Sequence, residues 1–326
     1  MLTDSPAITS SSLAAATTTT IEDLHPDVVT RTLRLLDGPT LAAACSATSQ
    51  LRSLSTQSDL WLKLCLSTWP SLQHPRFLPL ISASPRYFFS DAFRFPAFHA
   101  NNALPVSEEA AALPGTLISA VDIYHRGVLI FSRFVETETS SSWFRGSPFL
   151  IDATDQMAEP LLPGVIISPG ELMLSWILFD PAQGRAVNVS SRRAVAVERH
   201  WYTGETVVRF AGAAVSEGKV ICAVVTCSEM TGQVQEVVLT AEDIDDVCVS
   251  GEEGLQVVRT VMEAGRNKWR GKAAEEEEAK ERYLEYLRGK RRRKESRARR
   301  EGAMDLCCTA IGVAVFLGFL ALVVFR

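Results

Sequence analysis

The sequence lacks the short motifs that mark the common enzyme active sites. Its 326 residues contain no His-Glu-x-x-His, no Gly-x-Ser-x-Gly and no glycine-rich phosphate loop. His125 falls in a predicted turn, and His200 stands beside Trp201 and Tyr202. A lone histidine next to aromatic residues is more often a packing or hydrogen-bonding residue than a base. We therefore predict a protein that is not an enzyme and needs no cofactor.

Paired cysteine patterns are also absent. Seven cysteines are scattered along the chain, and none of them forms a Cys-x-x-Cys. An odd number without regular spacing argues against a disulfide framework and favours a reducing compartment. Cys222 and Cys227 lie five residues apart on a predicted strand, so they would face opposite sides. The sequence thus predicts no metal site.

Basic residues are missing from the first twenty positions, which are rich in Ser, Thr and Ala. A secretory signal needs a basic start and an apolar core, and a transit peptide needs arginines. We therefore predict that residues 1–20 are a disordered lead.

Negative charge predominates in the body of the chain and positive charge at its end. Residues 1–265 hold 17 Lys and Arg against 29 Asp and Glu, a balance of -12. Residues 266–326 hold 16 Lys and Arg against 9 Asp and Glu, a balance of +7, so that the whole chain has a net charge of -5. This split predicts a local electrostatic role for the C-terminal segment.

The most informative segment that is present runs from Leu24 to Trp69. Apolar residues recur there every three or four positions in three stretches, 24–36, 41–54 and 60–66. Helices this short bury their leucines only by packing on one another, and part of the apolar surface can remain for a partner. The pattern predicts three helices, either as a docking module or as an ordinary helical subdomain.

This segment resembles an F-box. The late tryptophan of the family pattern is Trp61, and the Leu-Asp turn is Leu36-Asp37. The chain departs from the pattern at His25, Thr32 and Leu51, where the family has proline, isoleucine and tryptophan. The resemblance implies a three-helix F-box over residues 21–69 that binds a Skp1-like protein and through it a cullin. The implied Skp1-binding residues are Leu24, Pro26, Leu33, Leu36, Leu41 and Trp61.

Prolines and aromatic residues alternate over residues 70–115. The prolines exclude long helices, and so many aromatic residues are unlike a flexible linker. We predict a bridge that packs between the helical segment and the next domain of the chain.

From Leu117 onward the apolar residues recur with a period of two. The stretches 117–124 and 128–135 flank a turn and predict a hairpin. Further strands are predicted at 171–179, 186–189, 194–201, 206–210, 219–228 and 234–239. Closely spaced strands with short turns predict an antiparallel β-rich domain over residues 116–250, folded over as a sandwich or a barrel. The capping-box-like Thr240–Asp243 predicts a change to helix.

Four runs in this region resemble a plant F-box family: WFRGSPF (143–149), LSWILFDP (174–181), NVSSRR (188–193) and ERHWYTGE (198–205). Its members join an N-terminal F-box to such a β-rich domain and a basic, membrane-anchored tail. The resemblance covers most of residues 20–326. It implies an adaptor in a Skp1–cullin–F-box ubiquitin ligase, with the β-rich domain as the part that binds an unknown protein substrate.

The last apolar run, residues 306–325, carries no charge. Twenty helical residues span ~30 Å, the thickness of a bilayer core, so we predict a single transmembrane helix. A buried core helix is the alternative. Only Arg326 comes after it, which predicts a tail anchor. A charged helical stalk is predicted over residues 255–301.

Basic residues at the end of the stalk favour a cytosolic body by the positive-inside rule. They can also attract membrane lipids with anionic headgroups, and a nuclear localisation signal is the competing interpretation. The predicted membrane-surface residues are Arg291, Arg292, Arg293 and Lys294.

Three smaller signals remain. Cys307 and Cys308 stand at the predicted membrane boundary, where they are either palmitoylated or plain lipid-facing residues. Ala310, Ala314 and Gly318 form a stripe of small residues through which two copies can pair as a homodimer. A basic cluster in the β-rich domain predicts either a ligand groove or a solvated strand edge; it comprises Arg192, Arg193, Arg199 and His200.

The sequence thus predicts an α+β protein with an N-terminal three-helix F-box, a central antiparallel β-rich domain, a C-terminal basic helix and a single transmembrane helix. The predicted function is that of a substrate-recognition adaptor of a Skp1–cullin–F-box ligase, held on a membrane with its body in the cytosol and without a nucleic-acid partner. The alternative is a tail-anchored scaffold or trafficking protein with a ligand-binding β-domain and no ligase role.

Overall fold

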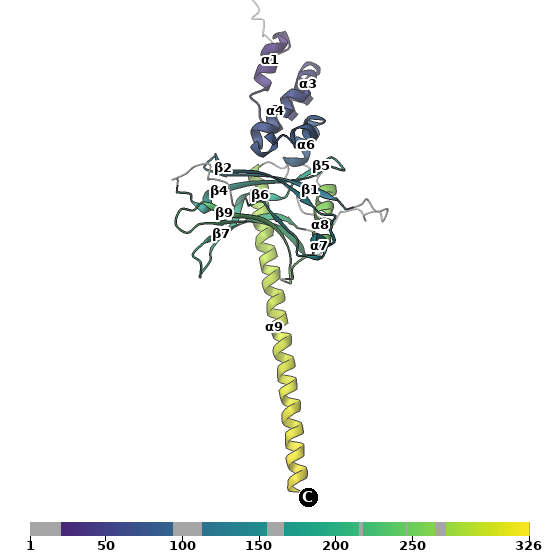
Figure 1. Ribbon diagram of the computed structural model, residues 1–326, viewed down its shortest axis with the longest axis vertical. Helices are drawn as coiled ribbons and strands as arrows, with labels where there is room; N and C mark the ends of the chain where they lie inside the picture. Colours follow the sequence, from purple (N-terminus) through teal and green to yellow (C-terminus); the bar gives the residue numbers. More distant parts are fainter. Residues whose placement is uncertain are drawn as a thin grey trace, which may run out of the picture. The chain divides into compact units, whose positions relative to one another are not determined.

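The computed structural model describes residues 21–93, 113–154, 166–214, 218–245, 247–264 and 272–325 (Figure 1). The chain divides into two compact units, Met1–Leu64 and Cys65–Arg326. Each unit is described by itself. The predicted lead over residues 1–20 and residues 94–112 of the predicted bridge lie outside the described residues.

The first unit is built from short helices. Its last helix, α4, begins in this unit and ends in the second. The elements are η1 (Ile21–Asp23), α1 (Pro26–Leu33), α2 (Gly38–Ala47), α3 (Ser49–Ser55) and α4 (Ser58–Thr68). Among the described residues, the buried apolar side chains are Val29, Leu33, Leu41, Cys45, Leu51, Leu60 and Trp61.

The single helix predicted over residues 41–54 is wrong, because Thr48 divides it. Thr48 has an extended backbone, with φ −141° and ψ 164°, and its Oγ1 accepts a hydrogen bond from Leu51 N at 3.2 Å. It is therefore the N-cap of a new helix, α3. Asp37 caps α2 in the same way, since its Oδ1 accepts from Thr40 N at 3.0 Å.

Three short helical elements begin the second unit after α4. They are η2 (Pro70–Gln73), α5 (Leu78–Ser82) and α6 (Pro85–Ala92), each with a proline in its first turn. Their aromatic side chains pack on the β-sheet of this unit. The Phe77 ring lies 5.9 Å from Phe134 and 5.3 Å from Phe179, centroid to centroid. The described part of the predicted bridge is thus a layer on the β-domain.

In the described part of the second unit, nine strands form an antiparallel sheet in the order β2-β1-β4-β6-β7-β8-β9-β3, with β5 beside β4. They are β1 (Thr116–His125), β2 (Val128–Glu138), β3 (Leu150–Asp152), β4 (Leu172–Asp180), β5 (Arg185–Asn188), β6 (Ser190–Arg199), β7 (Thr206–Ala214), β8 (Lys219–Cys227) and β9 (Val234–Asp243). The strands predicted between residues 117 and 239 are confirmed. The short β3 has no counterpart among them.

The hairpin of β1 and β2 shows why its turn was recognisable. Arg126 and Gly127 both have positive φ, 52° and 82°. Two consecutive left-handed residues are what a type I′ turn needs, and glycine adopts this conformation without strain.

The predicted helix start at Thr240–Asp243 is wrong, because β9 continues through it. Thr240 pairs with Cys222 of β8 and with Leu150 of β3, and Ala241 pairs with Ile221. Two neighbouring strands supply backbone partners here, and this tertiary pairing outweighs a local capping signal.

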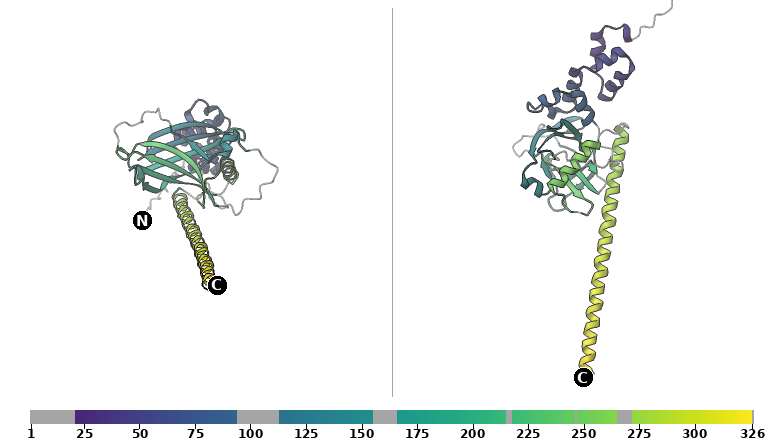
Figure 2. Two further views of the ribbon diagram at one scale, coloured as in Figure 1. Left: turned by 60° about the horizontal axis from the view of Figure 1, so that its bottom comes forward. Right: turned by 90° about the vertical axis from the view of Figure 1, so that its right-hand side faces the viewer.

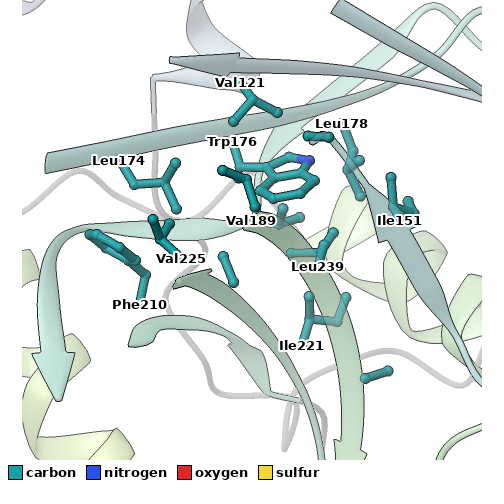
Figure 3. Packing of buried hydrophobic residues seen from close by; sticks show 14 of the residues in the cluster. Val121, Ile151, Leu174, Trp176, Leu178, Val189, Phe210, Ile221, Val225 and Leu239 are labelled. Carbon is teal, nitrogen blue, oxygen red and sulfur yellow. The ribbon is translucent and has the colours of Figure 1, made fainter. Parts of the chain in front are cut away.

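The sheet folds over between β4 and β6, whose recorded register has one pair, Met173 opposite Arg193. The two halves face each other across a shared apolar core (Figure 3). Trp176 of β4 is fully buried there, and its Nε1 donates a hydrogen bond to Ser119 Oγ at 3.2 Å. Phe210, Ile221 and Leu239 come from the opposite half. This is the predicted sandwich-like arrangement.

Helices α7 (Ser142–Gly146) and α8 (Gly251–Ala264) contribute to the same core, through Phe144 and Leu255 among others. The stalk predicted from residue 255 is therefore wrong in its first part, since the apolar side of α8 is buried. Residues 265–271 lie outside the described residues. α9 (Lys272–Val324) then continues without a break through the rest of the predicted stalk and the apolar run (Figure 2).

Candidate functional site

The six residues predicted to bind a Skp1-like protein fall into two groups. Leu33, Leu41 and Trp61 are buried and hold the helices together, and Leu36 is half-buried. The Trp61 indole donates a hydrogen bond to Ser55 O at 2.8 Å, which ties α4 to the end of α3. Leu24 and Pro26 are exposed. The exposed pair can touch a partner directly, whereas the buried residues shape the surface from beneath.

Further exposed apolar residues lie around α1, and the sequence prediction missed them. Val28 is 52% exposed and Leu35 is 84% exposed, and Ile21 is also exposed. Val28 lies in α1, whereas Ile21 is in η1, and Leu24 and Leu35 flank α1 in the chain. We call Ile21, Leu24, Val28 and Leu35 the α1 apolar face.

A cavity of about 300 Å³ lies where the sheet folds over, and we call it the β4–β6 cavity. Apolar walls come from Trp69, Phe93 and Met173. Polar residues line the rest, including Tyr124, Ser175 and Arg192. Burial is the main cause that raises the pKa of the Tyr124 phenol, whose hydroxyl donates to Thr68 O at 3.2 Å.

The predicted basic cluster is not one groove. Arg192 lines the β4–β6 cavity, whereas Arg193 pairs with Glu276 of α9 at 3.3 Å. Arg199 pairs with Glu229 at the other end of β6. His200 lies in the exposed turn after that strand, where Thr203 N donates to its Nδ1 at 3.2 Å. Only Arg192 of the four lines this cavity.

A buried carboxyl, Asp122 of β1, joins three elements. It accepts hydrogen bonds from Ser71 N at 3.0 Å, from Ser71 Oγ at 2.6 Å and from Ser132 Oγ at 2.7 Å. Burial raises the pKa of Asp122 to about 6, against the lowering effect of these hydrogen bonds. The carboxyl thereby connects η2 to β1 and β2.

The first turns of α9 pack on the sheet. Tyr283 is buried beside Ala211 of β7, and Tyr286 donates a hydrogen bond to Asp243 O at 3.3 Å. Lys290 pairs with Glu242 at 3.5 Å, and Arg293 pairs with Asp245 at 2.9 Å. Arg293 is thus a domain contact as well as a predicted membrane-surface residue.

Beyond these contacts, every residue from Arg291 to Phe325 is exposed (Figure 2). At ~1.5 Å per residue, Arg293 lies about 20 Å along α9 from Leu306, and Arg300 lies about 9 Å from it. α9 is the one helix of the described residues that is long and apolar enough to cross a membrane. Cys307, Cys308 and the small-residue stripe lie on its exposed surface.

The described residues contain no group of three His, Cys, Asp or Glu that could hold a metal ion. The burial of Cys65, Cys222 and Cys227 raises the pKa of each thiol to about 12. These thiols therefore stay protonated and unreactive.

Helices with exposed apolar residues, a β-domain with a cavity and a long helix that ends in an apolar run define a modular α+β protein. Three relatives from Arabidopsis thaliana are similar to nearly the whole chain. F-box protein At2g27310 is 36% identical over 327 residues, which cover 91% of this chain and 94% of the relative. Probable F-box protein At2g36090 is 38% identical over 328 residues, 97% of each chain.

F-box protein At3g44326 is 36% identical over 329 residues, 91% of this chain and 87% of the relative. The chain therefore belongs to a family of plant F-box proteins. No protein-family model matches it, and no solved structure matches it.

Proposed function

We propose that this protein is a non-catalytic substrate-recognition adaptor of a Skp1–cullin–F-box ubiquitin ligase, held on a membrane by α9. The main support is the family: the relatives carry the name F-box protein and align over nearly their full length. Residues 21–69 are the proposed F-box, and the β-domain is the proposed substrate binder.

The α1 apolar face and Pro26 make the contact with the Skp1-like protein in this proposal. Leu24, Val28 and Leu35 present apolar surface to solvent, and such surface is stabilised when a partner covers it. Leu33, Leu41 and Trp61 act indirectly, because they are buried and fix the positions of the helices. Leu36 is half-buried, and in this proposal it both contacts the Skp1-like protein and helps to fix the positions of the helices.

The apolar part of α9 is the proposed membrane anchor, with the β-domain and the proposed F-box in the cytosol. The basic residues before it favour this orientation. Arg297, Arg299 and Arg300 are closer to the apolar run than Arg291–Lys294, so they meet anionic headgroups first. Palmitoylation of Cys307 and Cys308 would strengthen the attachment, and the stripe of Ala310, Ala314 and Gly318 would allow two copies to pair.

Binding to a purified Skp1-like protein tests the adaptor function. We expect the full-length protein in detergent to bind it, and Leu35→Glu to weaken binding about tenfold or more, because a charge would be buried in the interface. Met230→Glu is the matched control: Met230 is also 84% exposed but lies in the turn between β8 and β9.

Two results would contradict the proposal. One is no binding by the unaltered protein at micromolar concentrations. The other is equal weakening by Leu35→Glu and Met230→Glu, which would mean that the effect does not come from the α1 apolar face.

A further inference from the structure

We propose that the β4–β6 cavity binds an anionic side chain of an extended acidic segment in the substrate protein. This inference rests on the proposed adaptor function, because it assigns the substrate contact to one place in the β-domain. Every residue that lines the cavity lies in the second unit.

The cavity arises from the way in which the sheet folds over. β4 and β6 share one recorded pair, Met173 opposite Arg193. On the other side of β6, the register with β7 shifts between Ser190 and Ala194. Ser191 is buried at this irregular point of β6, whereas Arg192 is exposed and lines the cavity. An extended peptide that crosses the surface here can place one side chain beside Arg192.

Two hydrogen-bond donors at the cavity are left without a partner among the described residues. The Ser175 hydroxyl oxygen is buried and makes no hydrogen bond. Arg192 forms no ion pair with a described carboxylate. A buried hydroxyl without a hydrogen-bond partner destabilises the folded protein, and a ligand that accepts a hydrogen bond from it removes this destabilisation.

Most of the other polar groups of the wall are already engaged. Tyr124 donates its hydroxyl to Thr68 O, and Ser191 Oγ donates to Arg193 O at 2.8 Å. Ser190 Oγ accepts from Trp176 N at 3.0 Å. Asn188 accepts from Ser190 N at 3.2 Å through its oxygen, which leaves its amide NH2 as a further donor beside Ser175 and Arg192.

The charge at the mouth of the cavity selects an anion. Glu276 lines the cavity, but Arg193 neutralises it through their ion pair. Asp122 lies opposite Ser175 on β1, and its carboxyl is occupied by Ser71 and Ser132. Asp122 is buried and does not line the cavity, so Arg192 is the exposed charge in the wall that has no described ion-pair partner. A guanidinium binds carboxylate or phosphate with two parallel hydrogen bonds.

The size of the cavity favours a side chain of a peptide. The cavity volume of about 300 Å³ is at the lower end of the range for small-molecule sites. One side chain of a peptide and part of the next residue would fill the cavity. Trp69, Phe93 and Met173 supply an apolar wall for the methylene groups of such a side chain. Glutamate and phosphoserine both combine a short stem with an anionic head.

Fluorescent peptides with one fixed central residue and randomised flanks test the proposal. The four probes carry Glu, phosphoserine, Gln or Leu at the centre, and fluorescence anisotropy measures their binding to the full-length protein in detergent. We expect the Glu or the phosphoserine probe to bind, and the comparison of the two tells whether carboxylate or phosphate is preferred. The Gln and Leu probes should bind at least about tenfold more weakly.

The control uses a second arginine of β6. Arg192→Gln should weaken anionic probes about tenfold or more, whereas Arg199→Gln should change binding less than about twofold, because neither Arg199 nor its partner Glu229 lines the cavity. Ser175→Ala should weaken binding without lowering the melting temperature, since it removes a hydroxyl that makes no hydrogen bond in the free protein.

Three outcomes would overturn the inference: no anionic probe binds at millimolar concentration, the Gln probe binds as well as the better anionic probe, or Arg192→Gln and Arg199→Gln have equal effects. Binding of the Skp1-like protein is measured on the same preparations. If the unaltered protein does not bind the Skp1-like protein, the proposed adaptor function is refuted. The peptide measurement separately decides whether the cavity binds an anionic side chain.

Discussion

The helical first unit and the β-domain of the second unit differ in how they treat apolar side chains. The helical first unit leaves Ile21, Leu24, Val28 and Leu35 exposed, although it buries Leu41 and Trp61. The β-domain encloses most of its apolar residues between two halves of a folded sheet, and its cavity combines apolar walls with polar groups. A few short helices cannot enclose all their leucines, whereas a folded sheet can cover a core from both sides. From this difference we expect the first unit to bind through apolar area, and the proposed substrate contact of the β-domain to add charge and hydrogen bonds.

Among the substitutions that test this difference, Trp176→Ala should have the largest effect on stability. It removes a large, fully buried side chain and its hydrogen bond to Ser119, so the β-domain should lose ~3–5 kcal/mol of unfolding free energy. Denaturant unfolding measures the loss. Trp201→Ala is the control, because Trp201 is 89% exposed, and its effect should stay within ~0.5 kcal/mol. Equal effects of the two substitutions would contradict the described core.

In the helical unit, Leu41→Ala and Leu35→Ala should separate stability from binding. Leu41 is buried, so its truncation should cost ~2–5 kcal/mol. Leu35→Ala should leave stability within ~0.5 kcal/mol but weaken binding of the Skp1-like protein. Circular dichroism during unfolding and a binding titration measure the two effects. A stable Leu41→Ala variant would argue against the leucine core.

Ionisation of Asp122 should make the stability of the β-domain depend on pH, with a smaller effect than the core substitutions. Its folded pKa of about 6 exceeds the ordinary 3.8, so protonation favours the folded state. The contribution of Asp122 to stability is fully present below pH 3.8 and is lost as the pH rises to about 6. Asp122→Asn should lack this pH dependence. Unfolding of both proteins at a series of pH values measures the difference, and parallel curves would contradict the assignment.

The last prediction concerns the orientation of the chain in the membrane. If the β-domain is cytosolic, a glycosylation sequon in it should not be modified. The natural sequon Asn188-Val189-Ser190 is a poor reporter, because Ser190 is buried. Trp201→Asn creates the sequon Asn-Tyr-Thr in an exposed turn, and a cytosolic β-domain should leave it unmodified in microsomes. An acceptor sequon appended after Arg326 is the positive control. A glycan at position 201 would reverse the proposed orientation.

Sequence patterns were sufficient where local signals and tertiary structure agree. The hairpin of β1 and β2 was predictable because alternating apolar residues surround a turn with glycine. The later strands were predictable for the same reason. At Thr240–Asp243 the local signal favoured a helix, but pairing with β8 and β3 continued the strand. The helical spacing predicted that Thr48 lies within a helix. The hydrogen bond from Leu51 N to Thr48 Oγ1 caps a new helix instead, and it depends on backbone geometry that the spacing of apolar residues does not reveal.

Parts of the candidate site were predictable only as residue types. The leucines of the proposed F-box were predicted from the resemblance to the family pattern, which did not show that Leu33 and Leu41 are buried and that Val28 and Leu35 are exposed. The basic cluster on β6 was recognised, but the chain directs Arg192, Arg193 and Arg199 to three different environments. Neighbouring residues on a strand point to alternate faces, so adjacency in sequence does not imply a shared site.

The sequence by itself determined the order of the modules, since helical, alternating and uncharged apolar patterns depend on nearest neighbours along the chain. It also determined the family and the length of apolar helix available to a membrane. The tertiary structure alone decided which residues remain free to bind. The β4–β6 cavity, the unpartnered Ser175 and the buried Asp122 arise where distant strands meet, and long-range packing sets burial and hydrogen bonding there.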